Sequence, residues 1–435
     1  MKGQHQSVES QYNSKEDDIM SKTKPFSIEK GLVYEAYKRV KANSGGCGVD
    51  QQSLEIFEKN VSGNLYKLWN RLSSGSYFPP PVKGVSIPKK AGGERILGIP
   101  TVSDRIAQMV CKIVFEPNVE KIFHRDSYGY RPGRSALHAI GITRRRCWRF
   151  DWVVEYDIKA LFDTIDHSLL MKAVCKQTNE TWILLYIERW LKAPMALSDG
   201  SLIPRDRGTP QGGVVSPVLS NLFLHYALDM WLDRTFPHLE WCRYADDGVI
   251  HCKSELEAEQ IRTALRDRLE ECGLELNEKK TKIVYCKDGR RKETYSQTQF
   301  TFLGYTFRRR CVRDAKGDVF LGFTPAVSLE ARKDMQTKTR QGKIHLMSGH
   351  SLESIAKLYN PVLRGWMNYY GCFTGSAMYP VLRHFNKVLL KWAQRKYKKL
   401  KDRKMRSVRF MERVAKQRPD LFVHWSIKSM REGFI

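Results

Sequence analysis

Two adjacent carboxylates, Asp246 and Asp247, are the residues of this chain best placed for metal-dependent chemistry. They lie in segment 241–250, where aromatic and β-branched residues predict a β-hairpin with Ala245 and the two acids at its tight turn. Neighbouring acids in a partly buried turn repel each other unless a cation such as Mg²⁺ compensates their charge. Taken alone, however, an Asp-Asp pair is most often only a solvated turn.

A second acid, Asp157, lies 89 residues before Asp246 and changes that interpretation. It ends an apolar segment, 153–157, that predicts a strand, and an aromatic residue and a helix start follow it. Two Mg²⁺ ions held about 3.5–4 Å apart need carboxylates from separate strands that bridge them. We therefore predict a two-Mg²⁺ site for phosphoryl transfer, in which Asp157 and Asp246 bridge the ions and Asp247 completes the set.

A glycine-rich turn, 207–213, lies between the two acidic segments and leads into an apolar segment that predicts a helix. Glycine lets a nucleotide approach the backbone closely, and a helix N-terminus favours phosphate. Alone, such a loop would be only a weak indication of nucleotide binding.

Strand-like and helical segments follow one another in an order that fits an antiparallel α+β palm. The predicted strands are 83–88, 152–157, 241–252 and 281–286, and the predicted helices are 102–123, 166–176, 215–233 and 254–272. Beyond residue 325 or so the pattern becomes helical and strongly basic.

The order of these segments resembles that of group II intron-encoded reverse transcriptases of the maturase type. The matching blocks are 85–89, 92–101, 127–136, 153–163, 207–221, 244–247, 273–281, 302–305 and 365–370. The resemblance spans most of the chain, from residue 30 to residue 425. It implies an α+β right-hand polymerase with fingers and an antiparallel-sheet palm, followed by an α-helical thumb or maturase domain.

The resemblance implies roles for residues near the acids. The backbone carbonyl of Ile158 would join Asp157, Asp246 and Asp247 as a metal ligand. These three acids would be catalytic together with Lys280, which matches the position that can protonate the leaving pyrophosphate. The neighbouring Lys279 and Lys282 leave the choice of that lysine open.

Five further residues would bind the nucleotide by the same resemblance. Lys89 and Arg95 would hold the triphosphate, since cations there offset its charge. The aromatic ring of Phe162 would lie under the sugar. Gln211 and Gly212 would line the base and sugar. The ring of Phe162 would clash with a ribose 2′-hydroxyl and so favour deoxynucleotides. A lone Phe after a strand is otherwise more often a core residue.

The charge of the chain indicates a polyanionic partner. Its 435 residues include 74 Lys and Arg against 47 Asp and Glu, a formal net charge of +27. No apolar run is long enough for a membrane span, and residues 1–30 lack the apolar core of a secretory signal. The ten cysteines include no Cys-x-x-Cys pair, so we expect reduced thiols and no zinc site. We expect a cytoplasmic protein, although a nucleoid-associated or an organellar one fits the sequence equally well.

The strongest local excess of positive charge lies in segment 383–418, which has 15 Lys or Arg and two acids. Aromatic residues are interleaved with these cations, a pattern that suits RNA binding. Most of the apolar residues there are expected in the core of the thumb, and the cations are expected to face RNA. The predicted contacts are Arg395, Lys396, Lys398 and Lys399.

Together these observations predict three regions: a polar, flexible leader at 1–30, fingers and palm at 31–320, and a helical thumb or maturase domain at 321–435. No endonuclease motif is visible, so we do not expect this chain to cleave target DNA, and insertion would need an existing primer.

The predicted function is RNA-directed DNA polymerisation together with help in splicing and mobility of a host group II intron. The expected partners are group II intron RNA, an RNA template with a DNA primer, deoxynucleoside triphosphates and target DNA, without a membrane. One alternative is a reverse transcriptase recruited to defence or repair without an intron. Another is an RNA-binding splicing factor with a vestigial polymerase, which the intact acids and Phe162 argue against.

Overall fold

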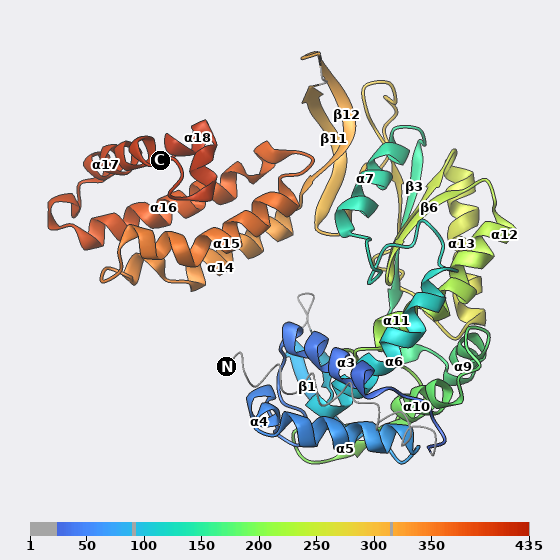
Figure 1. Ribbon diagram of the computed structural model, residues 1–435. Helices are drawn as coiled ribbons and strands as arrows, with labels where there is room; N and C mark the ends of the chain where they lie inside the picture. The colour runs from blue at the N-terminus through green and yellow to red at the C-terminus, as the bar shows by residue number, and fades with distance from the viewer. Residues whose placement is uncertain (1–23, 89–92, 314–315, 435) are drawn as a thin grey trace.

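The computed structural model describes residues 24–88, 93–313 and 316–434. The chain passes from a fingers region, blue in Figure 1, through a palm sheet, green to yellow, to a helical unit in orange and red. Within the described ranges, no helix combines the length and the apolar character that crossing a membrane requires.

The palm is an antiparallel sheet in the order β6-β7-β3-β8, with β9 also paired to β3. Its strands are β3 (Trp152–Lys159), β6 (Glu240–Tyr244), β7 (Asp247–Cys252), β8 (Glu275–Leu276) and β9 (Lys282–Tyr285). The predicted hairpin is confirmed, since β6 pairs with β7 and only two residues separate them. Strand β3 does not end at Asp157 as we expected. It continues to Lys159 because β8 pairs with its last two residues.

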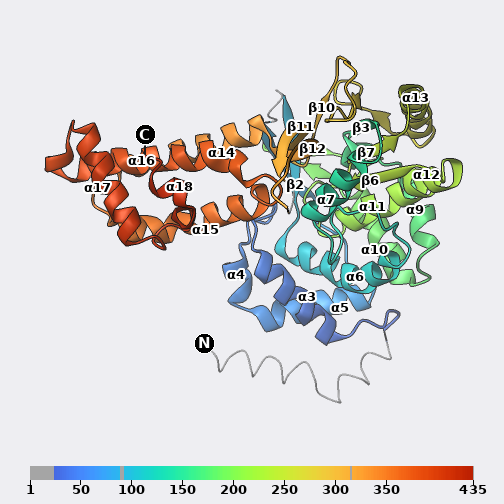
Figure 2. The ribbon, with the colours of Figure 1, turned by 90° about the horizontal axis from the view of Figure 1, so that it is seen from above.

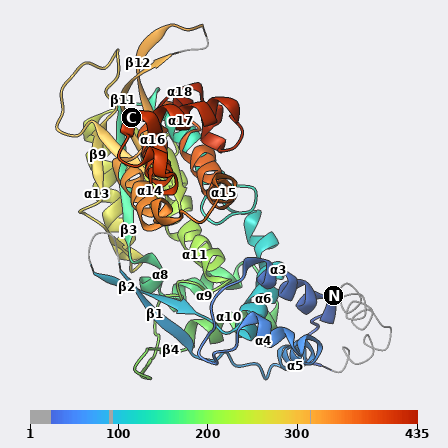
Figure 3. The same ribbon diagram turned by 90° about the vertical axis from the view of Figure 1, so that its left-hand side faces the viewer.

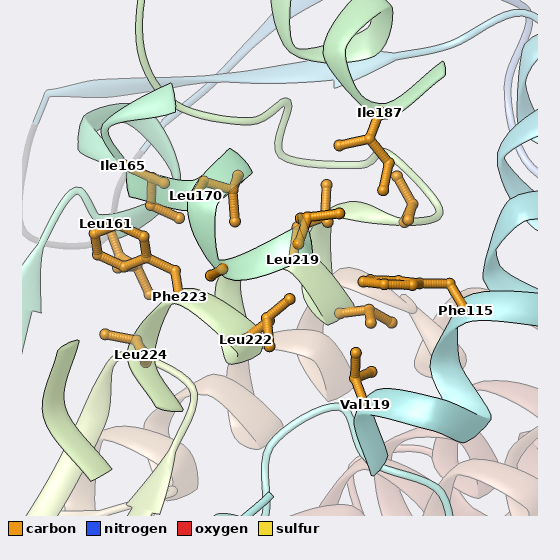
Figure 4. Packing of buried hydrophobic residues seen from close by; sticks show 14 of the residues in the cluster. Phe115, Val119, Leu161, Ile165, Leu170, Ile187, Leu219, Leu222, Phe223 and Leu224 are labelled. Atoms are coloured by element: carbon orange, nitrogen blue, oxygen red, sulfur yellow. The ribbon is translucent and has the colours of Figure 1, made fainter. Parts of the chain in front are cut away.

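Helices cover one face of this sheet and form the largest hydrophobic core with it. They are α6 (Val102–Glu120), α9 (His167–Cys175), α10 (Thr181–Lys192), α11 (Ser216–Leu224), α12 (Met230–Thr235) and α13 (Glu255–Glu271). Figure 4 shows Leu161 and Ile165 in the part of this core that also holds Leu222 of α11. Both residues are buried, so they anchor the single-turn helix α8 (Leu161–Thr164), which begins at Leu161 and ends just before Ile165.

The predicted helix 215–233 is interrupted. A π-helical turn, His225–Asp229, separates α11 from α12. The wider turn shifts the register of the following residues, and such turns are often found at functional sites. Here it places Asp229 in a fully buried position beneath the palm hairpin, where it pairs with Arg243.

The fingers consist of helices and a small mixed sheet in the order β2-β1-β4-β5. The helices are α3 (Lys30–Asn43), α4 (Leu54–Glu58) and α5 (Val61–Ser73), and the strands are β1 (Val82–Pro88), β2 (Glu94–Ile99), β4 (Met195–Ala196) and β5 (Leu202–Ile203). Residues 1–23 of the predicted leader lie outside the described residues. Near the end of that leader, Ile28 is buried and its carbonyl accepts a 2.6 Å hydrogen bond from Trp69 Nε1.

The other face of the palm sheet packs against α7 (Ala136–Cys147) and a three-stranded sheet, β10-β11-β12. The strands of that sheet are β10 (Gln299–Phe302), β11 (Tyr305–Arg313) and β12 (Val319–Val327). Strands β11 and β12 form a long hairpin whose outer half stands away from the body of the protein, as Figure 3 shows.

The C-terminal helices have a hydrophobic core of their own, centred on buried residues such as Trp392 and Trp425. They are α14 (Leu329–Gln341), α15 (Leu352–Tyr370), α16 (Tyr379–Lys396), α17 (Lys404–Gln417) and α18 (Lys428–Arg431). Figure 2 shows this unit extending to one side of the palm and fingers, to which β11 and β12 connect it.

Candidate active site

Three acidic residues meet at the same end of two neighbouring palm strands. Asp157 of β3 and Asp247 of β7 are directly opposed in the antiparallel register. The hairpin turn between β6 and β7 adds Asp246, whose backbone oxygen accepts a 3.0 Å hydrogen bond from the Ile158 nitrogen. The structure therefore brings together all four residues predicted as metal ligands.

The turn between β8 and β9 supplies the partners of Asp157. Lys280 Nζ lies 2.6 Å from Asp157 Oδ1, and Asn277 Nδ2 donates to Asp157 Oδ2 at 2.8 Å. The Asn277 backbone nitrogen also donates to the Asp157 oxygen at 2.9 Å, which fixes the turn beside the acid. We had assigned no role to Asn277, although it lies in one of the matching blocks.

The acids are in an unfavourable environment for three negative charges. Burial, and then the charges of Asp246 and Asp157, raise the pKa of Asp247 to about 8. Burial also raises the pKa of Asp246, and the charge of Asp157 acts in the same direction. Although burial alone would lower the pKa of Lys280, its hydrogen bond to Asp157 and the nearby acids raise it.

This set of donors fits a divalent cation, because a cation would compensate the acids whose burial and mutual repulsion raise the pKa of Asp247. In the described part of the chain, no three His, Cys, Asp or Glu side chains already converge as a metal cage. Both carboxylate oxygens of Asp157 are engaged by Asn277 and Lys280.

A buried ion pair supports the acid-bearing hairpin from beneath. Arg243 and Asp229 are both fully buried, and Arg243 donates to the two Asp229 oxygens at 2.7 and 2.6 Å. The same guanidinium donates to the Ala245 oxygen and to Asn221 Oδ1, each at 3.1 Å, and to Ser127 Oγ at 2.9 Å. It thereby ties the turn to the π-helical turn, to α11 and to the loop after α6.

That loop docks against the hairpin and presents Tyr130. A Cβ on Gly129 would lie 2.5 Å from the Ala245 nitrogen, so only glycine permits this approach. The Gly129 oxygen accepts a 2.7 Å hydrogen bond from Asn221 Nδ2. Tyr130 follows in a left-handed conformation with φ 57°, and the residue remains 52% exposed. Its centroid lies 6.5 Å from that of Phe162 and 6.4 Å from that of Tyr244.

We assigned no role to Tyr130 from the sequence, although it lies in the matching block 127–136. Burial, and next the charge of Asp246, raise the pKa of its phenol, and Arg95 acts in the opposite direction. The side chain therefore lies within electrostatic range of both the acids and the fingers. An exposed aromatic residue with a positive φ is the structural signal that identifies it, and sequence spacing does not show it.

The other predicted nucleotide residues lie on segments that backbone hydrogen bonds connect to one another. Phe162 is half-buried on α8, and its oxygen accepts a 2.6 Å hydrogen bond from Thr209 of the glycine-rich loop. The Gln211 oxygen accepts a 2.8 Å bond from the Gly98 nitrogen of β2, the strand that carries Arg95. Gly212 has φ 122°, and a Cβ there would lie 2.3 Å from the Gly98 oxygen. Lys89 lies outside the described residues.

The predicted RNA contacts are not part of this site. They lie at the end of α16 and in the short 3-10 helix that follows, in the unit with the separate core. Arg395, Lys398 and Lys399 are exposed. Lys396 is less accessible, because its ammonium donates to the backbone oxygens of Ser348 at 3.0 Å and His350 at 2.8 Å.

An antiparallel palm sheet that joins three carboxylates, next to loops suited to a nucleotide, defines a nucleic-acid polymerase of the palm type. Residues 87–307 match the family "Reverse transcriptase (RNA-dependent DNA polymerase)", and residues 332–410 match "Group II intron, maturase-specific domain". The chain belongs to the reverse transcriptase family. It is an RNA-directed DNA polymerase that carries a maturase domain, and its family generally uses divalent metal ions.

Several individual proteins are similar to this chain. Protein YkfC of Escherichia coli is 34% identical over 317 residues, which are 62% of this chain and 79% of that protein. The group II intron-encoded protein LtrA of Lactococcus lactis is 27% identical over 449 residues, covering 82% of this chain and 72% of LtrA. Among solved structures, a telomerase of Candida albicans covers 87% of this chain and 71% of its own at 12% identity, with a TM-score of 0.45.

We predict that Arg243→Met lowers the free energy of unfolding by about 3–5 kcal/mol, because it leaves the Asp229 charge buried and unpaired. The double variant Arg243→Met, Asp229→Leu should recover most of that loss, since it removes both charges. Denaturant titrations of the purified variants measure both effects. Exposed ion pairs contribute less than about 1 kcal/mol to the free energy of unfolding. A loss that small in the single variant would show that the pair does not support the hairpin.

Proposed function

We propose that this reverse transcriptase adds deoxynucleotides to a DNA primer on an RNA template at Asp157, Asp246 and Asp247. The observation that carries the proposal is the direct opposition of Asp157 and Asp247 across β3 and β7, with Asp246 in the adjoining turn. Charges that repel in this way are stabilised when cations bind between them and the substrate phosphates.

In this proposal the three acids and the Ile158 carbonyl hold two Mg²⁺ ions. The ions would lower the pKa of the attacking 3′-hydroxyl and stabilise the leaving oxygens. Lys280 already has its ammonium beside the acids and can deliver a proton to the leaving pyrophosphate. Arg95 and Lys89 would hold the triphosphate, and Gln211 and Gly212 would line the base and sugar.

We predict that Asp246→Ala reduces primer extension by at least about a hundredfold, because losing an acid that would hold the metal ions removes several kcal/mol of charge stabilisation. Extension of a labelled DNA primer on RNA with Mg²⁺ measures the effect. Asp267→Ala is a matched control, since Asp267 is an exposed acid on α13. Near-normal extension by Asp246→Ala would contradict the assignment of this acid.

We further propose that Phe162 discriminates against ribonucleotides and that Tyr130 holds its ring in place. Leu161 and Ile165 fix the backbone on both sides of Phe162, but its side chain is only half-buried. The edge-to-face contact with Tyr130, at an interplanar angle of 82°, restrains the exposed side of the ring. Tyr130 is therefore a positioning residue for the sugar.

Phe162→Ala should raise ribonucleotide incorporation relative to deoxynucleotide incorporation, because the clash with the 2′-hydroxyl is removed. Tyr130→Ala should produce a smaller change in the same direction, through KM for the nucleotide more than through kcat. Tyr130→Phe keeps the ring contact and should behave as the wild type. Competition between ribonucleotides and deoxynucleotides during extension measures the discrimination of all three variants. Unchanged discrimination in Phe162→Ala would show that Phe162 has only a structural role.

We also propose that the region from 321 to 435 binds the RNA of a host group II intron and assists its splicing and mobility, while 31–320 forms the polymerase. The maturase-specific match at 332–410 supports this division, as does the separate core of the helical unit. The exposed cations Arg395, Lys398 and Lys399 would contact RNA phosphates, whereas Lys396 mainly holds the loop at 348–350.

We predict that Gln substitutions at Arg395, Lys398 and Lys399 weaken binding to a group II ribozyme RNA. They should also flatten the dependence of affinity on salt, because fewer counterions are released. Extension of a pre-formed primer–template should change little. Lys396→Gln is the contrasting variant, because the Lys396 ammonium holds the backbone oxygens of Ser348 and His350. It should lower the melting temperature and leave the salt dependence of RNA affinity nearly unchanged.

The comparison RNA is an unstructured strand of equal length. An intron-binding protein prefers the ribozyme, because RNA shape is recognised as well as charge. Equal affinity for both RNAs in wild type and variants would instead favour the alternative, a reverse transcriptase without a host intron.

A further inference from the structure

Two polar residues of α6, Asp104 and Gln108, are almost completely buried, and neither has a role in the reaction as proposed above. They lie one helical turn apart, and Gln108 Nε2 donates a 2.9 Å hydrogen bond to Asp104 Oδ2. Burying a carboxylate and an amide is unfavourable unless their polar atoms find partners. The partners of this pair therefore show what the two side chains hold in place.

Gln108 contacts the end of the glycine-rich loop 207–213. Its side-chain oxygen accepts hydrogen bonds from the backbone nitrogens of Val214 at 2.7 Å and of Val215 at 3.4 Å. A Cβ on Gly213 would lie 3.2 Å from the same oxygen, so the loop passes close to the amide. Backbone N–H groups can only donate, so the oxygen of the Gln108 amide faces the loop and its nitrogen faces Asp104.

Asp104 fixes this orientation of the Gln108 amide. Its Oδ1 accepts hydrogen bonds from the Tyr77 hydroxyl at 2.8 Å and from Trp190 Nε1 at 2.7 Å. Burial raises the pKa of Asp104, and the hydrogen bonds from Tyr77, Trp190 and Gln108 act in the opposite direction. Because both oxygens of the carboxylate accept hydrogen bonds, it attracts the nitrogen of Gln108 and leaves the amide oxygen for the loop.

The loop held in this way carries two of the residues assigned to the nucleotide. Gln211 and Gly212 precede Val214 by three and two residues. The Gln211 oxygen also accepts the 2.8 Å hydrogen bond from the Gly98 nitrogen of β2. The short segment between these two attachments therefore has little freedom, and a shift of the Val214 nitrogen would move the peptide groups that line the base and sugar.

We propose that Gln108, oriented by Asp104, is a positioning residue for the incoming nucleotide. Neither side chain touches the nucleotide. Their effect passes through the Val214 nitrogen to Gln211 and Gly212, whose place relative to the base and sugar they determine. The inference rests on the contact of Gln211 and Gly212 with the nucleotide that is proposed above.

Exchanging the two side-chain types provides a test that hardly changes their volume. In Asp104→Asn, the new amide oxygen must still accept from Tyr77 and Trp190, so its nitrogen faces the nitrogen of Gln108. In Gln108→Glu, two buried carboxylates face each other, which is unfavourable. In the double variant the new amide donates to the new carboxylate, whose other oxygen accepts from the loop. Every hydrogen bond of the network is then restored.

Two measurements on the full-length protein follow the loop and the nucleotide separately. Hydrogen–deuterium exchange of the peptide that contains Val214 and Val215 reports whether their N–H groups are held, and it needs no turnover. Extension of a DNA primer on RNA gives KM for the deoxynucleotide and kcat. Gln177→Glu is the matched control, because the half-buried Gln177 donates to the Tyr226 hydroxyl at 2.6 Å instead of to Asp104.

Each single variant should speed the exchange of that peptide by about tenfold, since the hydrogen bond that protects Val214 is weakened. Each should also raise KM for the deoxynucleotide by about fivefold, with a smaller change in kcat, because the loop no longer holds the nucleotide in place. The double variant should return both values toward those of the wild type. The control should leave both nearly unchanged.

Exchange and KM in both single variants equal to those of Gln177→Glu would overturn the inference, even if their melting temperatures fall. Tyr77→Phe removes only one hydrogen bond to Asp104, so it serves as the test if the single variants fail to fold. It should cause a smaller rise in KM, and no rise would overturn the inference. Faster exchange with unchanged KM would also overturn the positioning role, and it would trace the failure to the proposed contact of Gln211 and Gly212 with the nucleotide.

Discussion

The buried ion pair between Arg243 and Asp229 is the interaction on which the rest of the active site depends. A guanidinium that is shielded from water must donate its hydrogen bonds to other protein groups. The Arg243 guanidinium donates to the π-helical turn, to α11, to the loop after α6 and to the hairpin turn. The turn that carries Asp246 is therefore held in a single position relative to β3. Such a network is costly to disturb, since losing either partner leaves a charge without water or a counterion.

The alternation of side chains along β3 explains how one strand serves both the core and the chemistry. Val154, Tyr156 and Ile158 belong to the large core with the helices. Asp157 has the opposite orientation, toward the face where Asp247 and Lys280 lie. The helices on the first face exclude water from one side of the acids, which strengthens the electrostatic interactions among them. A one-residue shift in register would bury the acid in the core, so the apolar residues also determine where the chemistry takes place.

The large positive charge of the chain is divided among places with different roles. At the acids, Lys280 neutralises Asp157. Along β11, burial, and then the like charges of Arg308 and Arg332, lower the pKa of Arg310. At the α16–α17 corner, Arg395 is exposed, whereas the nearby Lys396 is occupied by backbone oxygens. Net charge alone indicates that a polyanion binds, and only the partners of each cation show which side chains are available for it.

The sequence by itself determined the features that depend on residue type and short spacing. These are the hairpin around Asp246, the strand that contains Asp157, the order of the matching blocks and the basic character of the C-terminal region. Tertiary structure decided what depends on contacts between distant segments. Asp229, the partner of Arg243, lies on a π-helical turn, and Arg332 of α14 affects the charge of Arg310 on β11 from a distant part of the chain. Spacing along the chain determines only which residues are neighbours within a helical turn or along a strand. The approach of separate elements is set by how their side chains fill the common core.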